Sequence, residues 1–551
     1  MDNGSVDTIR FIGQQWPYFA GYFQDDWRVT NKLTLNLGLR WETTLPPIEQ
    51  EDRWMDFSPT RPNPAANNIL GAAIFAGSGQ GREGSRSLAD SWFGGWGPHI
   101  GVAYSLTPKT VIRSSFSRSF AVTTTVTGST HNQGFSTNPG FSTQDNGVSP
   151  AFLLSGTFPA FPLPPFISPS GSNGLAIPWW QNQEASRMPE YDSWNLSIQR
   201  QLGGSAVLDV AYNGQAGTHL QSALLNINQV QPSYLQTLGP AVLNSNINSA
   251  LAQASGIAKP YPTFNGSVAQ ALRPYPQFSG IDTWSGAGDH SGHSSYHAGI
   301  IKIEKRYSSG LTFQTSYVFS KLFTDSDTYW VTDNPRAADQ YNRRLEKSIG
   351  YYDITHNFKL GLVYDLPVGK GRKYLTSGIA GALLGGWRVS SIEYYASGRP
   401  IGINSGIDLP ISPNVGIRQA ATITTYDNWR GPMAGGNFDP NPAAANGGDR
   451  FFQPRSFFPA QPTDRVGNST RANPKLREFP NYNENISVGK SFQLREAMRV
   501  DFRWEAFNVF NRVRMGTGPR TLTDPNLGRL TSNSDLLNTP RTMQFGLKFY
   551  F

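Results

Sequence analysis

Apolar and polar residues alternate along many segments of this 551-residue chain. The segment 33–42 reads LTLNLGLRWE, and the segment 498–505 reads MRVDFRWE, in which four apolar residues alternate with four charged ones. A period of two residues predicts β-strands with one apolar and one polar face. A soluble sandwich would also alternate. Four successive charges on one face, however, favour a hydrated lumen opposite a lipid-facing surface.

The same pattern predicts thirteen strands spread over the whole chain. We expect them near residues 18–29, 33–43, 96–106, 110–121, 191–202, 205–213, 295–307, 310–322, 355–366, 387–398, 482–492, 497–509 and 541–551.

Short and long connections between these strands alternate in strict order. Tight turns are expected at 30–32, 107–109, 203–204, 308–309 and 494–496, and the longer turn 367–386 carries an apolar run. The other connections are long, near 44–95, 122–190, 214–294, 323–354, 399–481 and 510–540. Bacterial transmembrane barrels have short periplasmic turns and long extracellular loops. The fold class predicted is therefore all-β, an antiparallel transmembrane β-barrel.

The last strand ends in a run of alternating large apolar residues. Phe545, Leu547, Phe549 and Phe551 share one face of this strand. A terminal aromatic residue on such a strand resembles the assembly signal recognised by the outer-membrane barrel-assembly machinery. An unpaired edge strand that can add to a partner sheet is a physical basis for that recognition. The other interpretation is a last strand that carries part of an aromatic girdle, and both interpretations predict a barrel.

Composition agrees with a barrel that carries long loops. Aromatic residues make up 13% of the chain, and it has 56 glycines and 39 prolines, which suits strands joined by turn-rich segments. The most apolar run, 379–387, is far shorter than the roughly 20 residues of a spanning helix. The chain has no cysteine, so thiolate metal sites and disulfides are excluded.

The net charge of +8 does not indicate a nucleic-acid partner. The 47 lysines and arginines are scattered without a run of five, so no basic patch is expected. The polar start of the chain lacks the features of a signal peptide. Because an outer-membrane protein needs one, we expect that the start of the protein has been lost from this chain.

Six groups of residues, in order along the chain, resemble the barrel of TonB-dependent receptors, in particular the Oar-like group that carries a carboxypeptidase-regulatory-like domain. The six groups are 22–30 with 33–42; 295–297 with 304–306 and 310–313; 353–356 with 364–372; 385–387 with 397–400; 505–511; and the final strand. Each group is weakly specific alone, and together they are quite specific.

This resemblance implies a barrel of about 22 strands with an N-terminal plug coupled to TonB. The chain would then be the C-terminal barrel portion: residues 1–17 the tail of an extracellular loop, and residues 18–551 the last strands, with no plug domain. An odd number of strands agrees, because bacterial barrels have even numbers and an open sheet leaves unpaired edges in lipid. We therefore expect a truncated or split product, in which TonB acts only through the missing plug.

Candidate ligand-binding residues lie in the long connections. His290 and His293 are weak candidates for a metal site, because two loop histidines fall short of the three or four ligands that such sites use. Trp179, Trp180 and Trp284 could contact a saccharide or peptide ligand, although the same composition suits loops that pack on themselves. The G-x-G-x-x-G match at 79–84 lies in a loop and lacks the strand and helix of a dinucleotide site.

The expected function is that of a receptor barrel in the outer membrane of a Gram-negative-type bacterium, surrounded by lipid. The complete protein would take up a large solute. We expect no catalytic residues and no cofactor, and the chain is not expected to be an enzyme. The alternative is a surface adhesin or a secretion-related barrel without energised uptake. A soluble all-β enzyme is the third hypothesis, and it predicts extraction without detergent.

Overall fold

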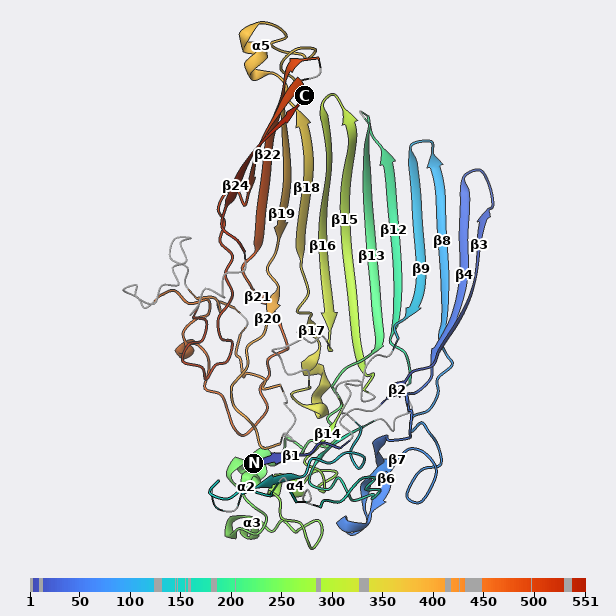
Figure 1. Ribbon diagram of the computed structural model, residues 1–551, viewed down its shortest axis with the longest axis vertical. Helices are drawn as coiled ribbons and strands as arrows, with labels where there is room; N and C mark the ends of the chain where they lie inside the picture. The colour runs from blue at the N-terminus through green and yellow to red at the C-terminus, as the bar shows by residue number, and fades with distance from the viewer. Residues whose placement is uncertain are drawn as a thin grey trace.

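A single large antiparallel sheet dominates the computed structural model (Figure 1). The structure describes residues 3–8, 13–122, 131–143, 145, 147–153, 155–156, 160–179, 186–203, 205–283, 289–326, 336–411, 418–425, 427–431, 448–496, 498–529 and 538–551. No helix among these residues is long and apolar enough to cross a membrane.

Thirteen long strands form this sheet, and we call them the wall. They are β3 (Tyr18–Arg28), β4 (Leu33–Thr44), β8 (Trp96–Thr107), β9 (Thr110–Phe120), β12 (Glu190–Gln201), β13 (Ala206–Leu220), β15 (Gly292–Ser308), β16 (Leu311–Thr324), β18 (His356–Asp365), β19 (Trp387–Ala396), β22 (Asn481–Arg495), β23 (Met498–Phe507) and β24 (Thr542–Tyr550). All thirteen predicted strands are thus confirmed. The short strand β17 (Ser348–Ile349) adds to β16.

Strands of the wall that follow one another in the chain also lie side by side, from β3 at one edge to β24 at the other. Every neighbouring pair is antiparallel, as between β3 and β4 and between β23 and β24. Among the described residues, no strand pairs with the outer sides of β3 or β24. The wall is therefore an open curved sheet, as the odd number of strands predicts.

Hairpin turns gather at one end of the wall and the long connections at the other (Figure 1). The hydroxyl of Thr30 accepts hydrogen bonds from the backbone of Lys32 and Leu33, at 3.1 and 3.0 Å, and so closes the first turn. Between β15 and β16 the turn residues are Ser309 and Gly310, both with positive φ, as a two-residue hairpin requires. This turn lies one residue later than the predicted 308–309. The connection 366–386 carries the helix α5 (Gly378–Leu384) at the same end.

The strand β13 extends further towards the long connections than its alternation predicts. β13 continues past residue 213 to Leu220, where it pairs with the start of β15 across a register shift. The extension reads GQAGTHL, which lacks a period of apolar residues. Backbone hydrogen bonds alone can continue a sheet where it no longer needs a lipid-facing side, so the pattern ends before the strand does.

The remaining elements lie in the residues before β3 and in the long connections. The strands are β1 (Asn3–Ser5), β2 (Gln14–Gln15), β5 (Ile48–Glu49), β6 (Met55–Asn63), β7 (Ile69–Phe75), β10 (Gly140–Ser142), β11 (Ala176–Pro178), β14 (Gly280–Asp282), β20 (Pro400–Ile401) and β21 (Asn473–Arg477). The helices are α1 (Tyr234–Thr237), α2 (Gly239–Asn244), α3 (Ala250–Ala254), α4 (Val268–Ala271), and the 3-10 turns η1 (Pro64–Ala66), η2 (Gln340–Glu346) and η4 (Arg455–Phe457).

Candidate functional site

The two faces of the wall differ in chemistry at the edge formed by β23 and β24. On one face, apolar side chains continue from strand to strand, and β23 and β24 supply Phe502, Trp504, Phe545 and Leu547 as register partners. Phe545 and Leu547 are 75% and 74% exposed. Such a surface is stable only in contact with lipid or another apolar phase.

The opposite face carries hydrogen-bonded and charged side chains. Asp501 accepts a hydrogen bond from the hydroxyl of Ser491 on the neighbouring strand, at 2.6 Å. Arg503 pairs with Glu505, which also contacts Gln544 on β24. Charged rows of this kind are compatible with a water-filled lumen.

At the other end of the strands, the described parts of the long connections pack around three large apolar clusters and two smaller ones, and we call them together the loop assembly. The first cluster joins the connections 45–95, 121–189 and 221–291; it contains Met55, Phe57, Ala73, Phe75, Phe135, Ile177, Trp179, Phe278 and Ile281. The second contains Val230, Leu235, Leu243, Ile247, Ala252, Phe264, Val268, Ala269 and Ile411. The third contains Ile401, Ile403, Ala421, Ile423, Trp429, Phe451, Phe452, Phe458, Leu476, Leu522 and Leu527.

Each of the three large clusters combines residues from connections that are far apart in the sequence. Hydrogen bonds between connections add to this packing: the side-chain amide of Gln277 donates to the carbonyl oxygen of Gly71 at 2.7 Å, and the backbone of Val230 donates to that of Ile411 at 3.2 Å. The long connections therefore support one another rather than extending separately from the strands.

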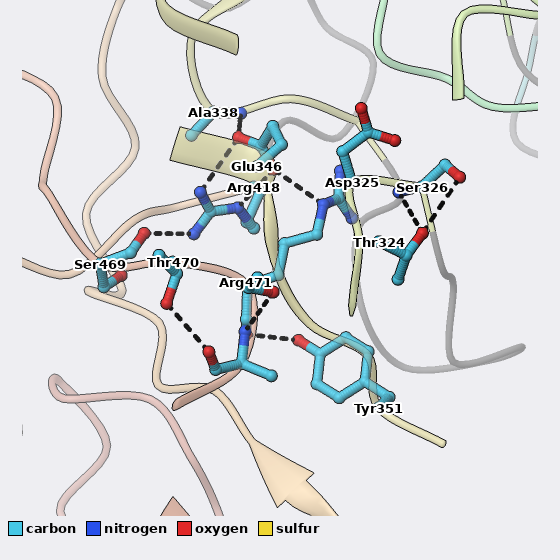
Figure 2. A network of polar contacts seen from close by, with 12 residues as sticks. Thr324, Asp325, Ser326, Ala338, Glu346, Tyr351, Arg418, Ser469, Thr470 and Arg471 are labelled. Atoms are coloured by element: carbon cyan, nitrogen blue, oxygen red, sulfur yellow. Dashed lines mark hydrogen bonds and ion pairs between the residues drawn. The ribbon is translucent and has the colours of Figure 1, made fainter. Parts of the chain in front are cut away.

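A buried ionic centre joins two of the connections (Figure 2). Glu346, at the end of η2, is completely buried and meets two arginines from the connection between β19 and β22. Arg418 donates from Nη2 to Oε1 at 3.0 Å and from Nε to Oε2 at 3.1 Å, and Nε of Arg471 lies 2.8 Å from Oε2. The backbone of Ala338 also donates to Oε1, at 2.9 Å. We call these residues the Glu346 centre.

The charge state of Glu346 follows from these contacts. Burial alone would raise the pKa of this carboxyl group, but the positive charges of Arg418 and Arg471 and the hydrogen bonds from Arg418 and Ala338 lower the pKa below its usual value. Glu346 is therefore a carboxylate at neutral pH. A buried charge that is paired on both oxygens is a strong constraint on geometry, because loss of either side leaves an uncompensated charge.

A second buried polar contact lies next to the first apolar cluster. His131 and Asp56 are both buried and hydrogen-bonded to each other, and Trp54 stacks on the imidazole with ring centroids 4.4 Å apart. The indole of Trp54 donates to Asp56 at 3.1 Å. Burial raises the pKa of Asp56, and the charge of His131 and the two hydrogen bonds offset part of that rise. This contact joins the connection 45–95 to the next one along the chain.

The structure places only one of the three predicted ligand-contact tryptophans. Trp179 follows β11, is 8% exposed and belongs to the first apolar cluster. Its backbone donates to the carbonyl oxygen of Asp282 at 3.1 Å. Trp180 and Trp284 lie outside the described residues. Trp179 therefore packs within the loops, which is one of the two interpretations that the sequence left open. Ligand contact by the three tryptophans stays a prediction.

The two candidate metal ligands have different surroundings. His290 is 2% exposed, whereas the side chain of His293 is 61% exposed and lies 3.5 Å from Asp325. The neighbouring carboxylate of Asp289 accepts hydrogen bonds from Leu225 and Ser291. Within the described ranges, no three histidine, aspartate or glutamate side chains gather as ligands of one metal ion. The metal site stays a prediction without further support.

The four residues of the predicted assembly signal lie on the edge strand β24 or directly after it. Phe545, Leu547, Phe549 and Phe551 point to the apolar face and are 75%, 74%, 48% and 93% exposed. Their recognition by the assembly machinery stays a prediction. Sequence reasoning missed the Glu346 centre, because Glu346, Arg418 and Arg471 are isolated in the sequence and no motif links them.

The sequence of the chain matches the model of one protein family. The outer membrane beta-barrel domain matches residues 3–544, and the chain belongs to this family. It is therefore a component of the outer membrane of a Gram-negative-type bacterium, with the hairpin turns on the periplasmic side and the loop assembly on the extracellular side. Among curated proteins, none matches the chain.

The solved structures that match the chain include two receptors and a transporter. The ferripyoverdine receptor of Pseudomonas aeruginosa is 11% identical, with 98% of this chain and 39% of that chain covered and a TM-score of 0.39. The ferric citrate transporter FecA is 9% identical, with 98% and 45% covered and a TM-score of 0.38. The ferric yersiniabactin uptake receptor FyuA from Yersinia pestis is 7% identical, with 100% and 47% covered and a TM-score of 0.37. The chain spans less than half the length of each of these proteins.

Proposed function

We propose that this chain supplies the wall and the outer loops of a TonB-dependent receptor of the Oar-like group, which takes up a large solute across the outer membrane. The observation that carries the proposal is the combination of a barrel wall with a polar face and an extracellular loop assembly packed around its own buried clusters. A loop assembly of this kind can present a ligand surface of fixed shape.

The six groups of residues quoted from the sequence support the Oar-like assignment within the outer-membrane barrel family. All six groups contain residues that end or begin strands of the wall, such as Asp365 at the end of β18 and Trp387 at the start of β19. In the complete receptor, a plug would fill the lumen and contact the polar face. TonB would reach the receptor through the plug, and this chain would itself perform no energy coupling.

The solute class is a separate part of the proposal. The sequence of the outer loops is rich in amide and aromatic side chains, which suits a saccharide or a peptide. The three proteins named above carry ferric chelates according to their names. A binding screen of this protein should therefore include ferric chelates, oligosaccharides and peptides, and one class is expected to bind to intact cells with saturation.

The decisive experiment concerns the gene and its transport activity. We expect the reading frame upstream of Met1 to encode a plug with a TonB-binding segment. Cells that carry this complete gene should accumulate the bound solute only when TonB is present and the inner membrane is energised. Binding without accumulation, unchanged by loss of TonB, would instead support an adhesin and would overturn the uptake proposal.

A further inference from the structure

The connection between β18 and β19 differs from the other turns at the periplasmic end. It spans residues 366–386 and contains α5 (Gly378–Leu384), which projects beyond the wall (Figure 1). The helix reads GIAGALL, with no charged or hydrogen-bonding side chain. Ile379, Leu383 and Leu384 are 80%, 62% and 57% exposed. Exposed apolar side chains in this number are unfavourable in the aqueous periplasm.

Side chains from the apolar face of the wall hold α5 in place. Lys490 of β22 donates from Nζ to the carbonyl oxygens of Ala382 and Leu383, at 2.5 and 2.9 Å. The indole of Trp387 donates to the same oxygen of Leu383 at 3.1 Å. A lysine and an indole at the last carbonyls of a helix are favourable, since those groups lack partners within the helix. The position of α5 is therefore specified by the fold.

The attachment point of α5 is continuous with the lipid-facing surface. Trp387 and Phe502 lie on either side of Lys490 in the strand register. Their rings pack edge to face with centroids 6.1 Å apart, and Phe502 in turn lies 6.4 Å from Phe545 of β24. The apolar surface of the wall therefore continues without a break onto the helix.

Basic residues precede the helix. The segment 366–387 contains Lys370, Arg372 and Lys373 and no aspartate or glutamate. Arg372 lies 3.4 Å from Asp365, whereas the described residues provide no carboxylate within ion-pair distance of Lys370 or Lys373. Both lysines are exposed. Basic side chains next to an exposed apolar helix are typical of segments that lie in the headgroup region of a membrane.

We propose that α5 and the basic segment before it lie in the periplasmic leaflet of the outer membrane. In this arrangement Ile379, Leu383 and Leu384 contact acyl chains, and Lys370 and Lys373 contact the headgroups of anionic phospholipids. The occupant of this surface is lipid, because the helix extends a face of the wall that already contacts lipid. The helix sets the depth of the barrel in the membrane and restrains its tilt away from the membrane normal.

The absence of cysteine from the chain allows a direct test. Single cysteines placed by Ile379→Cys and Leu383→Cys are spin-labelled in the full chain, folded into vesicles of phosphatidylethanolamine and phosphatidylglycerol. The accessibility of each label to oxygen, which dissolves in lipid, is compared with its accessibility to a water-soluble nickel chelate. Leu547→Cys on the lipid-facing surface and Val148→Cys in a loop are the references, being 74% and 86% exposed.

Labels at 379 and 383 are expected to favour oxygen as the label at 547 does. Their ratio of oxygen accessibility to nickel-chelate accessibility should be several-fold above the ratio at 148. A ratio equal to that at 148 would place α5 in water and overturn the proposal. Labels shielded from both reagents would indicate a protein partner and would also overturn it.

The headgroup contact has its own test. The paired change Lys370→Glu and Lys373→Glu is expected to lower the oxygen preference at 383 in vesicles with phosphatidylglycerol, and to lower it less in pure phosphatidylcholine. An equal decrease in both lipids would overturn the contact with anionic headgroups. No solute or TonB is present in these measurements, so their outcome does not depend on the proposed uptake function.

Discussion

The wall and the loop assembly are stabilised in different ways, although both are built from the same chain. In the wall, each strand pairs with its neighbour in sequence, and its large apolar side chains remain exposed for lipid. In the loop assembly, segments that are far apart in sequence bury apolar clusters and the Glu346 centre. The wall therefore depends on its solvent, whereas the loop assembly depends on long-range contacts within the protein.

The largest effect is expected at the Glu346 centre. Glu346→Ala leaves Arg418 and Arg471 buried without their carboxylate, which costs about 3–5 kcal/mol. We expect faster proteolysis of the extracellular loops while the strands stay protected, as measured by mass spectrometry of timed digests. The matched control is Glu51→Ala, because Glu51 is exposed and pairs with Arg53 only at the surface. Equal digestion of both variants would contradict the role assigned to this centre.

The stability of the wall should depend on which of its two faces receives an added charge. Phe545→Arg puts a guanidinium on the lipid-facing side of β24 and is expected to destabilise the folded barrel by about 2–4 kcal/mol if this position is near the bilayer midplane. Gln544→Arg puts the same charge on the polar side, beside Glu505, and should change the free energy of unfolding far less. Urea titrations in lipid vesicles measure both. A larger loss for Gln544→Arg would reverse the assignment of the faces.

The chain end tests the assembly of the wall rather than its stability. If the alternating residues of β24 form the assembly signal, Phe551→Ala should lower the amount of barrel in the outer membrane several-fold. Quantitative immunoblots of membrane fractions measure this amount. The free energy of unfolding of the purified barrel should hardly change, because Phe551 is 93% exposed. If the Phe551→Ala barrel reaches the outer membrane in a normal amount, Phe551 is not part of an assembly signal, and the aromatic girdle is the interpretation that stands.

Acid should loosen the loop assembly before the wall. The pKa of Glu346 is lowered in the folded protein from an ordinary value of 4.5. Its ionised form therefore contributes stability that is complete above pH 4.5 and is lost as the pH falls through the lowered folded pKa. Hydrogen exchange of the backbone near Arg418 is expected to accelerate below pH 4.5. The same acceleration in Glu346→Gln would show that another group is responsible.

The smallest effect is expected for a charge pair on the polar face of the wall. The side chain of Arg503 is 64% exposed in its pair with Glu505. Arg503→Ala should therefore cost no more than about 1 kcal/mol, because water solvates the guanidinium and Gln544 still contacts Glu505. A loss as large as that of Glu346→Ala would mean that the polar face is shielded from water, contrary to a hydrated lumen.

Much of the wall could be predicted from single segments. The alternation in 33–42 and 498–505 specified β4 and β23 and their faces, because an antiparallel strand needs only its own pattern and an adjacent partner. The extension of β13 to Leu220 was missed, since backbone pairing there does not depend on apolar residues. In the loops, Trp179 was identified as an aromatic residue of interest, but its burial beside Phe278 and Ile281 could not be read from its neighbours in sequence.

By itself, the sequence determined the thirteen strands, their alternating connections and, for 33–42, 498–505 and the last strand, the apolar face. These properties are local, because they follow from a period of two residues and from turn residues a few positions apart. Only the tertiary structure decided that Glu346 meets Arg418 and Arg471, and that α5 rests on Lys490 and Trp387. Those contacts join residues that no short-range pattern relates. They form because buried charges and unpaired helix carbonyls need partners, wherever in the chain these lie.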